Sequence, residues 1–195
     1  MIVNEQSPEV KKRAEKIAKG IYISILSEGK YVLLKTSGTS MYPFIKSGDL
    51  LRVDPLNKYK IKRGDVLAID KGDSSDAWFY VHRFMGCVKK DGVRMCLTKG
   101  DANGRGFDKP VEFSKVVGKL SAIDRDGLII NLEHPIWDKF LNRHIADLSA
   151  RHGKGLKIFG PLFDAIIEWR WFFPKARKKM LRIINFIGKE QKKWA

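Results

Sequence analysis

Residues 78–101 read WFYVHRFMGCVKKDGVRMCLTKGD. Aromatic and β-branched residues recur in two runs, 78–90 and 93–101, on either side of Asp91-Gly92. An Asp-Gly pair between two such runs is a strong signal for a type I′ turn, in which both central residues take positive φ. The stretch therefore predicts a long antiparallel β-hairpin.

Further short segments of the same character surround this hairpin, and turn sequences such as Ser47-Gly48-Asp49 and Asp126-Gly127 separate them. They cover residues 31–36, 50–53, 65–69, 116–123 and 128–131. Many short strands with no helices between them favour an antiparallel, partly closed, coiled β-sheet. The predicted fold class is mainly β with appended helices.

Helical patterns flank the β-rich part. Ser7-Pro8 is typical of a helix start, and apolar residues then recur at helical spacing until Gly29: Val10, Ala14, Ile17, Ala18, Ile21 and Ile25. After Pro135 we expect helices over 136–149, about 161–173 and from 174 onward, with a linker at 153–155. The predicted organisation is an N-terminal amphipathic helix in 1–30, a β-rich domain in 31–132 and a basic helical tail in 133–195.

The chain is strongly basic, with a formal net charge of +16. From Arg151 onward, twelve Lys and Arg residues stand against three acidic residues, which makes +9 of that total. Apolar stripes opposite Lys and Arg faces in this tail suit helices that lie in a membrane interface. We therefore expect residues 158–193 to bind an anionic membrane surface. Nucleic acid is not the expected partner, because base-contacting and stacking motifs are absent from the sequence.

The sequence shows neither a signal peptide nor a membrane-spanning run. The first twenty residues are polar and charged, and the best apolar run, 158–173, is interrupted by Asp164, Glu168 and Arg170. The expected location is peripheral to a membrane or cytoplasmic.

Cys87 and Cys96 are too few for a disulfide scaffold or a metal site. The hairpin register places them opposite each other, where a cross-strand disulfide is geometrically possible, but the lack of a secretion signal favours reduced thiols. We expect neither a metal nor a cofactor.

Residues 37–43, SGTSMYP, have the composition of a tight, exposed turn after a strand. A serine nucleophile needs such a turn, so that its hydroxyl projects and a backbone N–H can reach the oxyanion. The predicted hairpin adds a second component. In an unbroken ladder from the Asp91-Gly92 turn, His82 faces Asp101 on the same side of the sheet. A bulge at Gly86 or Gly100 would change that register.

These motifs resemble those of the type I signal peptidases and the related self-cleaving repressors. Residues 38–43 resemble the nucleophile box, and Gly64-Asp65-Val66-Leu67 resembles the strand that follows it. Val81-His82-Arg83 stands where bacterial signal peptidases have lysine and arginine, and a histidine there is similar to the archaeal and endoplasmic-reticulum enzymes. Lys99-Gly100-Asp101 and Asp108 resemble the two acidic positions of that branch. The resemblance covers roughly residues 31–120.

The resemblance implies a serine endopeptidase with Ser40 as nucleophile and His82 as general base. Either Asp101 or Asp108 would orient the histidine, and the hairpin register favours Asp101. The N–H of Ser40 would supply one oxyanion donor. Bacterial enzymes add a hydroxyl two residues upstream, where this chain has Gly38, so Thr39 or Ser37 is the candidate second donor. The substrate would be a leader or signal-type peptide or preprotein.

Two other functions fit parts of the sequence. One is a catalytically inactive peptidase-like module that binds membrane or nucleic acid through its basic tail. The other is a repressor-type protein that cleaves itself. Two features count against self-cleavage: only 39 residues precede Ser40, and the chain has no Ala-Gly or Cys-Gly bond of the kind such repressors cut.

Overall fold

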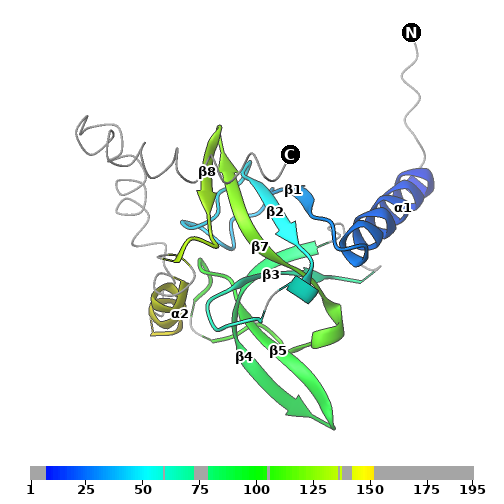
Figure 1. Ribbon diagram of the computed structural model, residues 1–195. Coiled ribbons are helices and arrows are strands. Elements are labelled where there is room, and N and C mark those ends of the chain that lie inside the picture. The colour runs from blue at the N-terminus through cyan, green and yellow to red at the C-terminus, as the bar shows by residue number, and fades with distance from the viewer. Residues whose placement is uncertain are drawn as a thin grey trace, which may run out of the picture. The chain divides into compact units, whose positions relative to one another are not determined.

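The computed structural model describes residues 8–58, 60–72, 79–104, 106–135, 137 and 142–151 (Figure 1). The chain divides into two compact units, residues 1–157 and 158–195. The helices expected over 161–173 and from 174, and the linker at 153–155, lie outside the described residues. So do residue 136 and residues 138–141, where the helix over 136–149 was expected to begin.

The described part is mainly β, with two helices, as the sequence predicts. The α-helices are α1 (Pro8–Ser27) and α2 (Asn142–Arg151), and short 3₁₀ turns cover Leu56–Lys58 and Phe113–Lys115. The strands are β1 (Val32–Lys35), β2 (Leu50–Asp54), β3 (Val66–Asp70), β4 (Phe79–Lys90), β5 (Val93–Lys99), β6 (Val111–Glu112), β7 (Val116–Arg125) and β8 (Leu128–Asn131). The two-residue strand β6 is the one strand here that the sequence did not indicate, and neither 3₁₀ turn was indicated.

All strand pairings in this sheet are antiparallel. The strand order is β1-β2-β7-β3-β4-β5-β6, and β8 also pairs with β7. Strand β7 joins the two halves, because its residues 119–124 pair with β2 and its residues 116–119 pair with β3 (Figure 1). The sheet is therefore curled around β7.

Breaks in register allow this curvature. The β2–β7 ladder shifts between Arg52 and Val53, and the β3–β7 ladder shifts between Ala68 and Ile69. Such bulges bend a strand and increase its twist. Gly118 of β7 pairs with Ala68, next to the shift in the β3–β7 ladder. A Cβ on Gly118 would come 2.4 Å from Val53 Cγ1 and 2.7 Å from the Asp54 carbonyl oxygen. The close approach of β2 and β7 thus requires a residue without a side chain.

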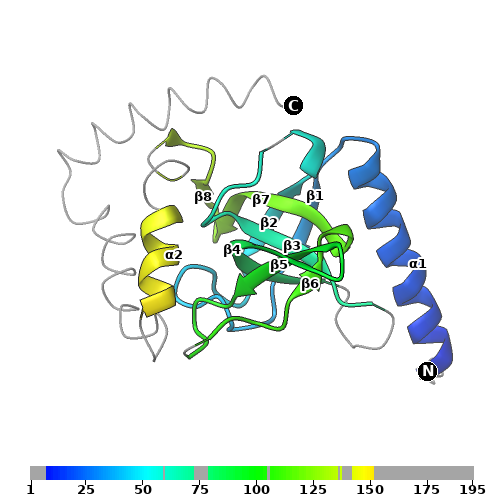
Figure 2. The same ribbon diagram turned by 90° about the horizontal axis from the view of Figure 1, so that it is seen from below.

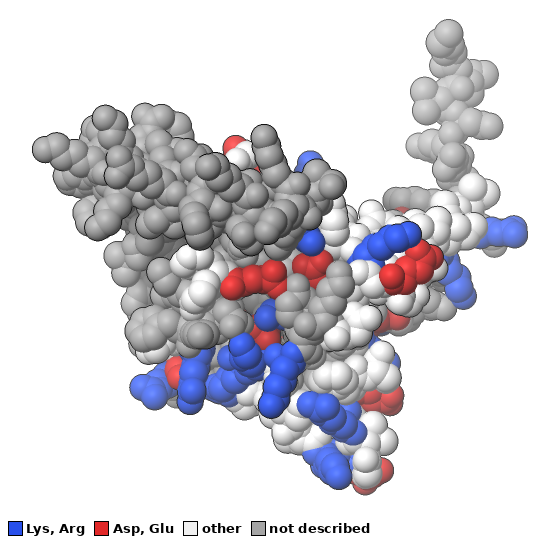
Figure 3. All heavy atoms as spheres, viewed as in Figure 1, with Lys and Arg blue, Asp and Glu red and all other residues white. Residues whose placement is uncertain are grey.

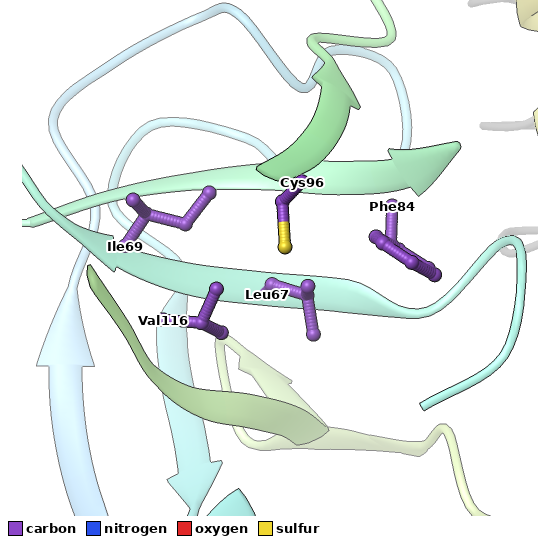
Figure 4. Packing of buried hydrophobic residues seen from close by; sticks show 5 residues of the cluster. All are labelled: Leu67, Ile69, Phe84, Cys96 and Val116. Atoms are coloured by element: carbon purple, nitrogen blue, oxygen red, sulfur yellow. The ribbon is translucent and has the colours of Figure 1, made fainter. Parts of the chain in front are cut away.

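Buried apolar residues from β3, β4, β5 and β7 fill the space inside the curl. Figure 4 shows the cluster, which consists of Leu67, Ile69, Phe84, Cys96 and Val116. Burial and the neighbouring Cys87 raise the pKa of the Cys96 thiol to about 12. Both cysteines are free, and Cys87 is exposed.

Helices α1 and α2 lie on opposite sides of the sheet (Figure 2). Helix α1 begins at Pro8 and is followed by Gly29 at φ 81°, as the sequence signals predict. It contacts the sheet through Lys19, whose Nζ lies 2.5 Å from an Asp70 carboxylate oxygen, and through buried Leu26. Among the described residues, no helix is long and apolar enough to span a bilayer.

The β4–β5 hairpin turns as predicted. Asp91 and Gly92 have φ of 51° and 79°, and Lys90 pairs with Val93, while Cys87 pairs with Cys96. The ladder does not continue unbroken. Its register shifts between Phe84 and Gly86, at one of the two glycines where a bulge was considered. Beyond the bulge every pairing differs by one residue from the predicted register.

We predict that Gly118→Ala destabilises the protein by about 1–3 kcal/mol, because the new methyl group would overlap β2 backbone. The free energy of unfolding in urea measures this. The matched control is Gly20→Ala on α1, where a Cβ meets nothing within 4 Å. This control should gain about 0.5–1 kcal/mol from helix propensity. Equal effects of the two substitutions would contradict the close packing of β2 on β7.

Candidate active site

Ser40 lies in the connection between β1 and β2. Hydrogen bonds close the base of this loop: the Thr36 N–H donates to the Asp49 carbonyl at 2.9 Å, and the Gly48 N–H donates to the Thr36 carbonyl at 2.9 Å. Met41, Phe44 and Ile45 are buried beneath the loop. The loop is therefore anchored at its base and by its apolar side chains, and Ser40 remains partly exposed.

Further hydrogen bonds fix the backbone at Ser40 and in the part of the loop that follows it. The Ala102 N–H donates to the Ser40 carbonyl at 2.8 Å. Arg125 donates to the Phe44 carbonyl at 3.0 Å and to both carboxylate oxygens of Asp49 at 2.9 and 2.7 Å. Gly100 permits the first contact, because a Cβ on it would come 2.8 Å from the Ser40 carbonyl oxygen. The segment after β5 thus packs directly on the serine.

Ser40, His82 and Asp108 form a continuous line of short contacts. His82 Nε2 lies 2.9 Å from Ser40 Oγ, and His82 Nδ1 lies 2.6 Å from Asp108 Oδ2. The side chains of His82 and Asp108 are 12% and 23% exposed. A hydroxyl, an imidazole and a carboxylate in this order can move a proton from the serine to the histidine while the carboxylate stabilises the resulting imidazolium.

Asp101 is not the partner of His82, so the predicted pairing is wrong. The bulge at Met85 shifts the ladder, so that Arg83 pairs with Lys99. Asp101 lies two residues after Lys99, so its side chain points to the same face as those of Lys99 and Arg83. The side chain of His82 points to the other face. The Arg83 guanidinium donates to both Asp101 carboxylate oxygens, at 2.8 and 2.6 Å.

The Arg83–Asp101 pair is fully buried, with both side chains 0% exposed. Arg83 also donates to the Gly64 carbonyl at 2.7 Å, and its guanidinium lies 4.6 Å from the centroid of the Phe44 ring. One side chain therefore connects the start of β3, the segment after β5 and the loop that carries Ser40. Its role in the site is to hold these segments together.

The chain after β5 folds back to bring Asp108 to His82. The Asp108 N–H donates to the Thr98 carbonyl at 2.9 Å, and Thr98 Oγ1 donates to Asp108 Oδ2 at 3.0 Å. Asn103 Nδ2 lies 3.5 Å from the other carboxylate oxygen. Burial alone would raise the pKa of the Asp108 carboxyl. The hydrogen bond and charge of His82, with the hydrogen bonds from Thr98 and Asn103, outweigh burial and lower that pKa.

Lys99 holds the loop that carries Asp108. Its side chain is buried, its Nζ donates to the Asn103 carbonyl at 2.9 Å, and it also donates to the Gly104 carbonyl. Burial lowers the pKa of Lys99, and the charges of Asp108 and Asp101 oppose that shift. Sequence reasoning gave Lys99, Thr98 and Asn103 no role, because their function depends on how the loop after β5 folds back.

Tyr80 packs on the histidine from the same strand, with ring centroids 5.1 Å apart in an edge-on arrangement. Residues two apart on a strand share a face, so the sequence did contain this signal. Burial and the charge of Asp108 raise the pKa of the Tyr80 hydroxyl, and a hydrogen bond with Thr98 opposes the shift. The edge-on contact between the two rings limits the rotation of the His82 imidazole.

A groove of about 550 Å³ opens beside Ser40. Tyr80 and Val81 of β4 line it, together with Leu34 and Lys35 of β1. Glu15 and Tyr22 of α1 also line it, and Ser37, Gly38 and Met41 lie next to Ser40. Of the two expected hydroxyl donors, Ser37 lines this groove, and both Ser37 and Thr39 are exposed.

No protein-family model matches the chain, and no curated protein is significantly similar to it. Within the described residues, no three His, Cys, Asp or Glu side chains lie together as metal ligands would.

The two aspartates should respond differently to the same substitution. We predict that Asp101→Asn lowers the free energy of unfolding by about 3–5 kcal/mol, because it leaves the Arg83 charge buried without its counter-charge. Asp108→Asn should cost no more than about 1.5 kcal/mol, because an amide can still accept and donate hydrogen bonds at this partly exposed position. Urea unfolding of both variants measures these free energies. A larger loss of stability in Asp108→Asn than in Asp101→Asn would contradict the structural role given to Asp101.

Proposed function

We propose that this chain is a serine endopeptidase of the type I signal peptidase kind, from the branch that uses histidine as the base. The observation that carries the proposal is the 2.9 Å contact between Ser40 Oγ and His82 Nε2, with Asp108 at 2.6 Å on the other ring nitrogen. The curled antiparallel sheet is consistent with such a fold, and the motif order quoted above supports it.

In the proposed reaction, His82 removes the Ser40 proton as Oγ attacks the peptide carbonyl carbon. Asp108 stabilises the protonated imidazole and holds its Nδ1–H, so that Nε2 faces the serine. The imidazolium then donates its proton to the leaving amine, and an acyl group remains on Ser40. A water molecule, deprotonated by the same histidine, hydrolyses this ester and regenerates the hydroxyl.

The negative charge on the carbonyl oxygen requires donors on the side of the groove next to the serine. We propose the Ser40 N–H as the first donor. A second would come from Thr39 or Ser37, because position 38 is a glycine and has no hydroxyl.

We propose that the substrate is an extended leader-type peptide that lies in the groove. Strand β1 stands at one end of the sheet order, and in the described part of the chain no strand pairs with its outer edge. An open edge can add a peptide as a further strand, through main-chain hydrogen bonds. Because Leu34 and Lys35 of this edge line the groove, a peptide paired there would pass Ser40.

A basic surface supports the proposed association with an anionic membrane. Figure 3 shows Lys and Arg side chains gathered over the β4–β5 hairpin and beside α2. Exposed cations on these elements include Lys89, Lys90, Arg94 and Arg143. This surface adds to the charge of residues 158–193, which the sequence identifies as the main candidate for lipid contact.

The decisive test is cleavage of leader-type peptides by the full chain and by Ser40→Ala and His82→Ala variants. We predict that each substitution lowers kcat/KM by about 10³-fold or more, because each removes one member of a unit that acts together. Cleavage products are quantified by mass spectrometry.

The matched control is Ser47→Ala, which changes an exposed serine in the same loop, seven residues from the nucleophile. Its kcat/KM should equal that of the unmodified chain. Full turnover in Ser40→Ala or His82→Ala would refute the mechanism. A folded chain that cleaves none of the peptides would favour the inactive module, and cleavage confined to its own backbone would favour the repressor-type reaction.

A further inference from the structure

Helix α1 presents apolar side chains to the outside of the molecule. Val10, Ile17 and Ile21 are 52%, 58% and 53% exposed. These positions belong to the apolar series that makes the helix amphipathic in sequence. Burial of such a stripe is the usual reason that an amphipathic helix folds onto a protein. Here each of these three residues stays more than half exposed.

The helix packs on the sheet with a different face. Lys19 and Leu26 are buried, and Tyr22 lies edge-on to Phe79 with ring centroids 6.5 Å apart. Positions 19, 22 and 26 share one face at a turn of about 100° per residue, and positions 10, 17 and 21 fall on roughly the opposite face. The helix therefore packs on the sheet with one side and turns its apolar stripe away from the sheet.

Charge distinguishes the partners that could cover the second side. Helix α1 contains five Lys and Arg residues and two Glu residues. Arg13 and Lys16 are exposed, whereas Glu15 faces the groove beside Ser40. Pairing of two such helices along the stripe would bring the cations of both copies together. An anionic lipid surface instead accepts the apolar side chains between its headgroups and attracts the cations.

We propose that the exposed stripe of α1, Val10, Ile17 and Ile21, is a lipid-docking face that lies in the interface of an anionic membrane. This stripe belongs to a different segment of the chain from residues 158–193, and the inference does not depend on the proposed peptidase activity. Because Glu15 and Tyr22 of the same helix line the groove, docking would hold the groove close to the lipid surface.

The test is cosedimentation of the full chain with vesicles of phosphatidylcholine that contain roughly 30% phosphatidylserine. We expect Ile17→Gln/Ile21→Gln to weaken binding by about tenfold or more, because two buried isoleucines are lost from the interface. Arg13→Gln/Lys16→Gln should also weaken binding to these vesicles by about tenfold, and should leave binding to pure phosphatidylcholine unchanged.

The matched control is Ile129→Gln on β8, which removes an isoleucine that is 47% exposed elsewhere on the molecule. It should bind as the unmodified chain does, and circular dichroism should show that all variants keep their fold. Unchanged binding of the Ile17/Ile21 variant would overturn the proposal. So would light scattering that shows a dimer for the unmodified chain and a monomer for this variant, because the stripe would then be a self-association face.

Discussion

The structure depends on one buried ion pair, between Arg83 and Asp101. Two charges without any exposure are tolerated only when each neutralises the other and their remaining hydrogen-bonding groups are satisfied. Arg83 meets this condition with Asp101 and with the Gly64 carbonyl. This requirement fixes β4, the start of β3 and the segment after β5 relative to one another. It also brings that segment onto the Ser40 carbonyl.

The same pair explains why the two aspartates have different tasks. His82 and Arg83 are neighbours on β4, so their side chains point to opposite faces of the strand. Arg83 takes Asp101 on one face of the strand, and His82 lies on the other, which it shares with Leu67 and Phe84. Asp108 reaches that face because the chain folds back through Asn103 and Gly104, whose carbonyls bind Lys99. One aspartate holds the fold together, and the other orients the imidazole.

Local signals in the sequence were sufficient for much of this arrangement. The Asp91-Gly92 turn, the Pro8 helix start and most strands followed from turn chemistry and residue type, because these depend on neighbours in the chain. Ser40 and His82 lie in contact as expected. The error over Asp101 came from the bulge at Met85, which depends on the curvature of the whole sheet. The spacing of Asp101 and Asp108 in the sequence cannot reveal which of the two a loop will bring to the histidine.

The packing of α1 shows a second limit of sequence patterns. Its apolar spacing correctly indicated a helix, yet the buried face includes Lys19, whose charge is matched by Asp70. The spacing of apolar residues reflects every surface that the helix contacts. The sheet is one such surface, and the proposed lipid interface is another. A hydrophobic stripe on a basic helix therefore need not point to the protein core.

We propose that His82, held by Asp108, activates Ser40. The most direct measurement is the rate at which a fluorophosphonate, which reacts with activated serines, forms a covalent adduct on the peptide that contains Ser40. Mass spectrometry locates and quantifies this adduct. We predict labelling of Ser40 alone, at a rate that falls by about 10²–10⁴-fold in His82→Ala. Equal labelling rates in the two proteins, or an adduct on a different serine, would contradict it.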